Sequence, residues 1–146
     1  ADQCYAAARD DALLDGRPGC VQGVLDAGLF LLHLAFGCRT NIYFRATASL
    51  HGTHLATDAD DSPHLLADKF QGELYYGFGE KDEYATPDVI ETLGKALGAA
   101  DVEYHHIVHA GAEHGYALPD RDIFDKRAAD RDWEIFSAML RRQLQG

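Results

Sequence analysis

The sequence has little methionine, little cysteine and few basic side chains. Its 13 basic residues stand against 24 acidic ones, which gives a formal net charge of −11. Nucleic-acid binding needs a clustered positive surface, so this balance disfavours nucleic acid as a partner. The single methionine is Met139, so Ala1 is not a translation start. We therefore expect that the chain was processed or excised from something longer.

A secretory signal and a membrane span are also missing from the sequence pattern. Residues 1–11 are polar and alanine-rich, without a basic start or an apolar block. The longest apolar run, Gly28 to Gly37, is interrupted by His33 and is shorter than the roughly 20 residues that a bilayer requires. We expect no membrane partner.

Cysteine is scarce and its spacing fits no disulfide framework. Cys4, Cys20 and Cys38 make an odd count, which favours a reducing compartment, and the prediction is cytoplasmic. No CxxC pair is present, which disfavours a thiolate zinc site.

What the sequence does contain is enough apolar material for a core. Hydrophobic residues make up 47% of the 146 residues, and no repeat or linker divides them. The length suits one domain, so residues 1–146 are predicted to form a single unit.

From residue 46 onward the chain contains strand-like and helix-like segments, which alternate clearly after residue 73. Strands are predicted over Ala46–Gly52, Glu73–Gly79 and Val102–Val108, and helices over 87–98 and from about Phe124 to Leu144. This alternation is typical of an α/β fold with a mostly parallel sheet flanked by helices, which places function at the carboxyl ends of the strands.

The two helices show their ends and their buried faces in the sequence. Thr86 is predicted to cap the first helix, with Pro87 at its first position and Gly98 at its end. An apolar stripe on the second helix predicts which side chains are buried there: Ala129, Trp133, Phe136, Leu140 and Leu144. Residues 2–14 are a further predicted helix, whereas residues 19–47 have no clear pattern.

An acid and a histidine follow two successive predicted strands. Asp82 comes just after Glu73–Gly79, and His114, 32 residues later, comes just after Val102–Val108. Successive strand ends of a parallel βαβ unit lie at the same edge of the sheet, so the two side chains are predicted to meet. Such a carboxylate fixes the imidazole tautomer and stabilises its protonated form. The alternative is a pair of loop residues without a chemical role.

Four stretches resemble the dienelactone hydrolase family of α/β-hydrolases. The resemblance covers Ser49 to Leu144, about the last two-thirds of the chain. Its pieces are SLHG (Ser49–Gly52), YYGFGEKDEYATP (Tyr75–Pro87), HAGAEHGYALP (His109–Pro119) and AADRDWEIF (Ala128–Phe136).

The resemblance implies a partial α/β-hydrolase fold in which Asp82 is the acid and His114 the base of a catalytic triad. The implied activity is hydrolysis of a small ester or lactone through an acyl-enzyme, without a cofactor. The sequence leaves open whether the chain forms a homodimer. The alternative is a catalytically inactive fragment or a binding module that keeps the fold.

The nucleophile that the resemblance requires has no clear counterpart. The family's elbow, G-x-C-x-G, is absent, and so is the serine form G-x-S-x-G. Cys38 follows an apolar run and a glycine, but only 14 residues separate it from Gly52. Cys20 lies 32 residues before Gly52 and has no strand-like run before it. Cys38 is the better candidate, and an inert thiol is the favoured interpretation of both.

The departure from the family falls within residues 20–47. A reading-frame disturbance, a misread sequence or an inactive descendant would each explain it. The family's amino-terminal half, including the oxyanion-hole loop, has almost no counterpart here. The basic residue that binds a substrate carboxylate has only Arg121 as a loose counterpart, so the resemblance does not carry over the substrate.

Two further assignments stay open at this point. Tyr116, beside His114, is predicted either to line a substrate pocket or to belong to the core. A zinc site is a distant alternative, with Asp82 or Glu113 joining a set of histidines between residues 51 and 114, but no zinc motif is present. These histidines are His51, His54, His105, His106, His109 and His114.

Overall fold

The computed structural model describes residues 46–70 and 72–145, and from residue 144 onward it describes the backbone only. The helix predicted over residues 2–14 and the three cysteines lie outside the described residues. Within them, the element order is β1 (Ala46–Leu50), η1 (Pro63–Lys69), β2 (Glu73–Gly79), α3 (Pro87–Ala99), β3 (Tyr104–His109) and α4 (Lys126–Gln145).

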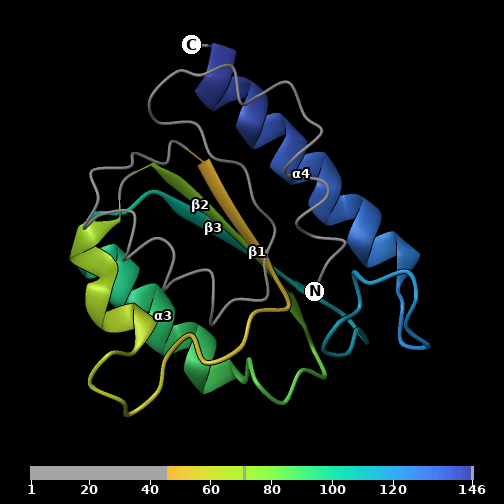
Figure 1. Ribbon diagram of the computed structural model, residues 1–146, viewed down its shortest axis with the longest axis horizontal. Coiled ribbons are helices and arrows are strands. Elements are labelled where there is room, and N and C mark those ends of the chain that lie inside the picture. Colours follow the sequence, from red (N-terminus) through yellow and green to blue (C-terminus); the bar gives the residue numbers. More distant parts are fainter. Residues whose placement is uncertain (1–45, 71, 146) are drawn as a thin grey trace.

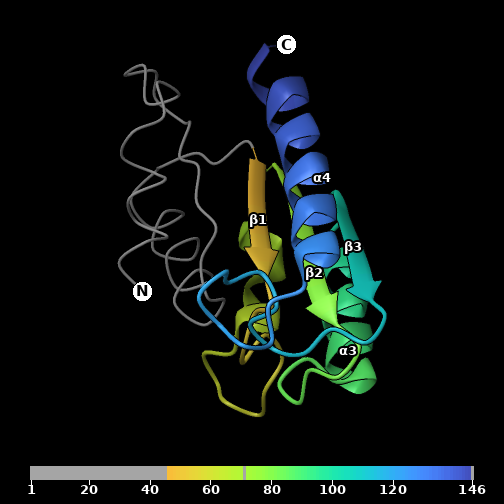
Figure 2. The ribbon, with the colours of Figure 1, turned by 90° about the vertical axis from the view of Figure 1, so that its right-hand side faces the viewer.

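The three strands form one parallel sheet in the order β1-β2-β3. The arrowheads point the same way in Figure 2, so the carboxyl ends of all three strands meet at one edge. This confirms the predicted α/β class with a parallel sheet. The third strand begins two residues later than expected, because Val102 N donates to Leu97 O at 3.0 Å and ends the turn after α3.

Helices cover both faces of the sheet (Figure 1). Both faces of the sheet are apolar and need a cover, because successive side chains of β2 point to opposite faces. Leu74, Tyr76 and Phe78 pack toward α3, whereas Tyr75 packs toward α4. The two apolar clusters, one under each helix, hold the sheet between two layers.

The start of α3 follows the predicted proline, but the predicted side-chain cap is wrong. Pro87 occupies the first turn and Thr86 the cap position, yet the Thr86 hydroxyl makes no capping hydrogen bond. Its carbonyl accepts from Ile90 N at 3.0 Å. The helix runs past Gly98 to Ala99, and Asp101, with a φ of 56°, makes the left-handed turn that follows it.

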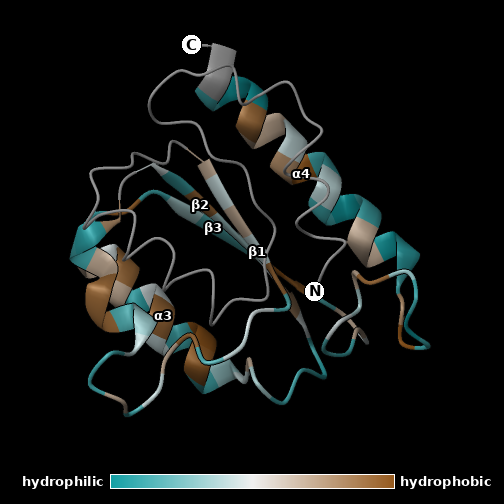
Figure 3. Ribbon diagram, in the orientation of Figure 1, coloured by the Kyte–Doolittle hydropathy of each residue, from teal (hydrophilic) through white to brown (hydrophobic). Residues whose placement is uncertain are grey.

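The start of α4 is capped by a side chain that the sequence analysis did not single out. Asp125 Oδ1 accepts from Ala128 N at 3.0 Å. Along this helix apolar and polar segments alternate (Figure 3). The prediction that Trp133 is buried is wrong, since 42% of its surface is exposed. Asp132 takes the inward position because it is hydrogen-bonded there, as described below.

No helix in the part of the chain that the structure describes is long and apolar enough to cross a membrane.

Candidate active site

Asp82 lies in the turn that follows β2, and its carboxylate is buried. Asp82 N donates to Gly79 O at 3.3 Å, which closes the turn. Its Oδ1 accepts from Tyr84 N at 2.9 Å, and its Oδ2 lies 3.0 Å from His114 Nδ1. The side chain has no exposed surface. Both oxygens are thus occupied, so the carboxylate is held in one orientation.

His114 lies in the loop after β3, and this loop packs directly on the end of β2. Lys81 N donates to Ala112 O at 2.9 Å, and Glu80 N donates to His109 O at 3.0 Å. A Cβ on Gly79 would lie only 2.6 Å from Ala112 O, so glycine is needed for this close approach. The packing brings the loop against the turn that carries Asp82.

Two aromatic side chains enclose the His114 ring. Tyr84 packs edge-on at 4.9 Å between ring centroids, and His51 does so at 5.3 Å. The His114 side chain is 23% exposed, so it remains accessible from solvent. With Nδ1 facing Asp82, the tautomer that carries a proton on Nδ1 leaves Nε2 to accept one. The arrangement can therefore provide a general base at Nε2.

His51 comes from the end of β1, so all three strands contribute to this edge. Its N–H donates to Gly77 O at 2.8 Å, and the residue is buried with a φ of 45°. His54, three residues later, has a φ of 55°. Left-handed backbone at residues other than glycine is uncommon and concentrates at functional sites.

The remaining predicted site residues are placed only in part. Cys38 and Cys20 lie outside the described residues, so their roles stay predictions. Arg121 is exposed in the same loop as His114. Tyr116 is completely buried, and its hydroxyl donates to Asp132 Oδ2 at 2.5 Å. It has the contacts of a core residue, and a substrate contact by Tyr116 stays a prediction.

Sequence reasoning missed a second, fully buried group of polar residues beside the site. Asp132 on α4 accepts from Tyr75 Oη at 2.6 Å and from Tyr116 Oη, and its Oδ1 lies 2.6 Å from His109 Nε2. Burial, together with the neighbouring Asp132, raises the pKa of both tyrosines above its usual range, so both hydroxyls keep the protons that they donate. The only signal in the sequence was an aspartate at an inward position of a helix.

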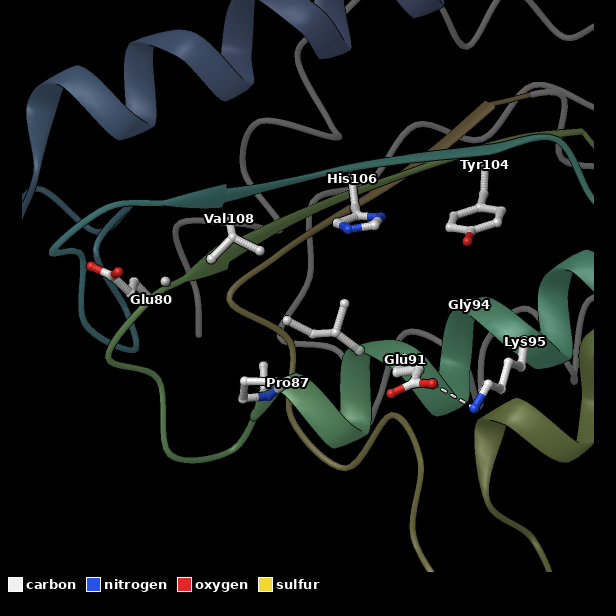
Figure 4. A pocket seen from close by; sticks show the side chains of 11 residues that line it. Glu80, Pro87, Glu91, Gly94, Lys95, Tyr104, His106 and Val108 are labelled. Carbon is white, nitrogen blue, oxygen red and sulfur yellow. Dashed lines mark ion pairs between the residues drawn. The ribbon is translucent and has the colours of Figure 1, made fainter.

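A groove of about 600 Å³ lies between α3 and β3 (Figure 4), and neither Asp82 nor His114 is among its lining residues. Tyr104, His106 and Val108 extend from β3 toward α3 and line it, and the ion pair between Glu91 and Lys95 lies on its other side. The groove therefore does not include the acid–histidine pair.

One group of described residues has ligand atoms close enough to share a metal ion, and it has only His105 in common with the zinc alternative considered from the sequence. It comprises Glu73, Glu103 and His105, at the amino-terminal side of the sheet. Glu73 is buried and already accepts from Arg142 at 2.5 Å and Gln143 at 3.0 Å. This cationic partner opposes metal binding, because it occupies the carboxylate that would be the main ligand.

The chain is similar in sequence and in fold to known proteins. A Synechocystis protein provisionally named a carboxymethylenebutenolidase is 29% identical over 103 residues, which are 68% of this chain and 42% of that protein. Among solved structures, a provisionally named dienelactone hydrolase of Klebsiella pneumoniae has a TM-score of 0.67 at 21% identity, over 81% of this chain and 49% of the other. A puromycin-hydrolyzing peptidase of Mycobacterium tuberculosis has a TM-score of 0.68 at 20% identity, over 96% of this chain and 24% of the other.

These structures show the α/β-hydrolase fold. The model of the dienelactone hydrolase family matches residues 32–144, and the chain belongs to this family of hydrolases. It spans less than half the length of the relatives described above.

Proposed function

We propose that the chain supplies the acid and the base of an ester or lactone hydrolase, with Asp82 as acid and His114 as base. The observation that carries this proposal is the 3.0 Å contact between Asp82 Oδ2 and His114 Nδ1 at the carboxyl edge of a parallel sheet. Family membership supports the reaction class. The Asp82 carboxylate is buried, as suits an acid that orients its partner, whereas the His114 imidazole is accessible, as suits a base that meets substrate.

The proposed reaction has two halves, with Cys38 as the candidate nucleophile and Cys20 as the second choice. His114 Nε2 takes the thiol proton, and the thiolate sulfur forms a bond to the ester carbonyl carbon. The C–O bond to the leaving alkoxide then breaks, and His114 gives that oxygen its proton. In the second half, water loses a proton to His114 and attacks the acyl carbon. The C–S bond then breaks, the acid product leaves, and His114 returns its proton to the thiolate sulfur.

Asp82 acts in both halves without exchanging a proton itself. It holds Nδ1–H of His114 and stabilises the imidazolium that forms each time Nε2 is protonated. An imidazolium also lowers the pKa of a neighbouring thiol, so the pair works near neutral pH. No cofactor is needed for this chemistry. The predicted compartment is a reducing cytoplasm, and the predicted substrate is a small ester or lactone. A homodimer is the oligomeric state that we consider for the chain.

The second candidate is a binding module that keeps the fold without catalysis. It is favoured by the absence of the G-x-C-x-G elbow from the sequence. This alternative predicts that the chain turns over no ester at a rate above buffer.

Hydrolysis of p-nitrophenyl acetate by the full chain separates the two candidates. The proposal predicts turnover that His114→Ala abolishes and that His106→Ala, an exposed histidine outside the pair, leaves unchanged. Turnover that is equal in both variants would contradict the assignment of His114. No turnover at all, by a folded chain, would favour the binding module.

A further inference from the structure

The carboxylate of Asp132 is the most completely enclosed charged group beside the site. Asp132 has no exposed surface, and it lies on α4, where it contacts three other elements. Tyr75 belongs to β2, His109 ends β3, and Tyr116 belongs to the loop that carries His114. A buried carboxylate is retained at this cost in desolvation only when its oxygens are well bonded.

The donors are divided unequally between the two oxygens of Asp132. Oδ1 is shared by Tyr75 Oη and His109 Nε2, each at 2.6 Å. Oδ2 is bonded to Tyr116 Oη, at 2.5 Å. Loss of the Tyr75 hydroxyl would therefore leave Oδ1 with a second donor. Loss of the Tyr116 hydroxyl would remove the buried side-chain hydrogen bond between α4 and the loop, whereas the exposed contact from Arg127 to Ala110 O, at 3.4 Å, would remain.

Tyr116 is connected to the catalytic histidine both along the chain and through space. It lies two residues after His114, with Gly115 at a φ of 88° between them. Its ring packs at 5.7 Å from the ring of His51, which in turn packs at 5.3 Å from the ring of His114. Any movement of the Tyr116 ring changes the surface against which His51, and then His114, is held.

We propose that Asp132 is a positioning residue, which holds the His114 loop in its working geometry through the Tyr116 hydroxyl. The kinetic consequence rests on the function proposed above, whereas the structural consequence does not. The bond fixes Tyr116 against a wall made by β2, since a Cβ on Gly77 would lie 2.4 Å from Tyr116 Oη. Displacements of about 1 Å in a catalytic group can lower a rate by about 10²-fold, so such a bond matters beyond stability.

Two tyrosine variants test this, because both remove one hydroxyl from the same carboxylate. Tyr116→Phe is expected to lower kcat by about tenfold and to change KM by less than about twofold, since alignment is lost and substrate contacts are kept. Tyr75→Phe is expected to leave kcat within about twofold of the parent value. Thermal melting should show a loss of stability in both, and a larger one in Tyr116→Phe, because Asp132 Oδ2 then loses its hydrogen bond whereas Oδ1 keeps His109 in Tyr75→Phe. Equal kcat values in the two variants would overturn the proposal.

A spectroscopic readout separates this proposal from the proposed function. The proton between His114 Nδ1 and Asp82 gives a resonance in proton NMR whose position reports their hydrogen bond. Tyr116→Phe is expected to shift or broaden this resonance, and Tyr75→Phe to leave it unchanged. If the chain hydrolyses no ester but the resonance responds in this way, the positioning role stands and the proposed function fails. If both variants leave the resonance unchanged, the positioning role is wrong whatever the activity.

Discussion

A Cβ placed on Gly77 would lie 2.7 Å from Asp132 Oδ2, so the backbone of β2 touches a side chain of α4 without any space between them. The same Cβ would lie 2.4 Å from Tyr116 Oη. The buried polar group therefore rests directly on the central strand. A displacement of the sheet, of α4 or of the His114 loop would therefore change the packing of the other two.

Gly77→Ala is expected to destabilise the chain by about 1–3 kcal/mol, the usual cost of overpacking a filled site. Gly98→Ala is the matched control, because a Cβ there meets nothing within 4 Å. In a helix this change is expected to stabilise by up to about 1 kcal/mol. Chemical denaturation measures both. A Gly77→Ala chain as stable as the parent would contradict the close contact.

Asp82→Asn is expected to lower kcat on the order of 10⁴-fold, because an amide permits the wrong imidazole tautomer at His114. The variant keeps the shape of the side chain, so its melting temperature should change far less than its activity. Asp88→Asn changes an exposed aspartate at the start of α3 and should leave kcat unchanged. An equal response of the two variants in steady-state kinetics would show that Asp82 is a loop residue without a chemical role.

The three strands and the two long helices were predictable because each has a strong local pattern, whereas the short helix η1 was not predicted. The β2 bounds, Glu73–Gly79, agree with the aromatic run that ends in a turn, and α3 begins at the predicted Pro87. The approach of Asp82 to His114 follows from parallel topology, since successive strand ends share an edge. These features depend on neighbours in sequence or on a topological rule.

The Asp132 group could not be predicted, since its members are far apart in sequence. Tyr75 and Asp132 are 57 residues apart, and only the packing of α4 on the sheet brings them together. The same bonds explain the error at Trp133. Apolarity alone favoured the tryptophan as the buried residue, whereas three hydrogen bonds turn the neighbouring aspartate inward.

Arg142→Ala is expected to destabilise the chain by about 1–2 kcal/mol, because it leaves the buried Glu73 carboxylate with one fewer charged donor. This loss of stability is smaller than for a fully buried ion pair, because the Arg142 side chain is 57% exposed and screened by water. Arg141→Ala removes the same charge from the adjacent, exposed position of α4. Urea unfolding of the two variants should differ, and equal midpoints would show that the Glu73 contact adds nothing.

Stability is expected to fall as the pH rises above about 10, the ordinary pKa of tyrosine. Burial raises the pKa of Tyr76 in the folded chain, so the unfolded chain loses that proton first and is favoured by alkali. This contribution is fully present below pH 10 and is lost above it. Tyr76→Phe should reduce the loss of unfolding free energy between pH 8 and about pH 10.5.

The same substitution should leave stability at pH 7 unchanged or higher, because the buried Tyr76 hydroxyl has no hydrogen-bond partner among the described residues. Tyr84→Phe, at a tyrosine that is 45% exposed, is the control for the alkaline range and should keep the parent's pH dependence. A Tyr76→Phe chain that loses stability in alkali as steeply as the parent would contradict the burial argument.

The proposed function requires that His114, oriented by Asp82, activates a cysteine of this chain toward esters. Intact-mass measurement after brief exposure to a slowly deacylating ester, followed by peptide mapping, tests it most directly. We expect one added acyl group on a single cysteine, with Cys38 as the first candidate. This group should be absent from His114→Ala and present in His106→Ala. Equal, slow acylation of Cys4, Cys20 and Cys38, unaffected by His114→Ala, would contradict this expectation.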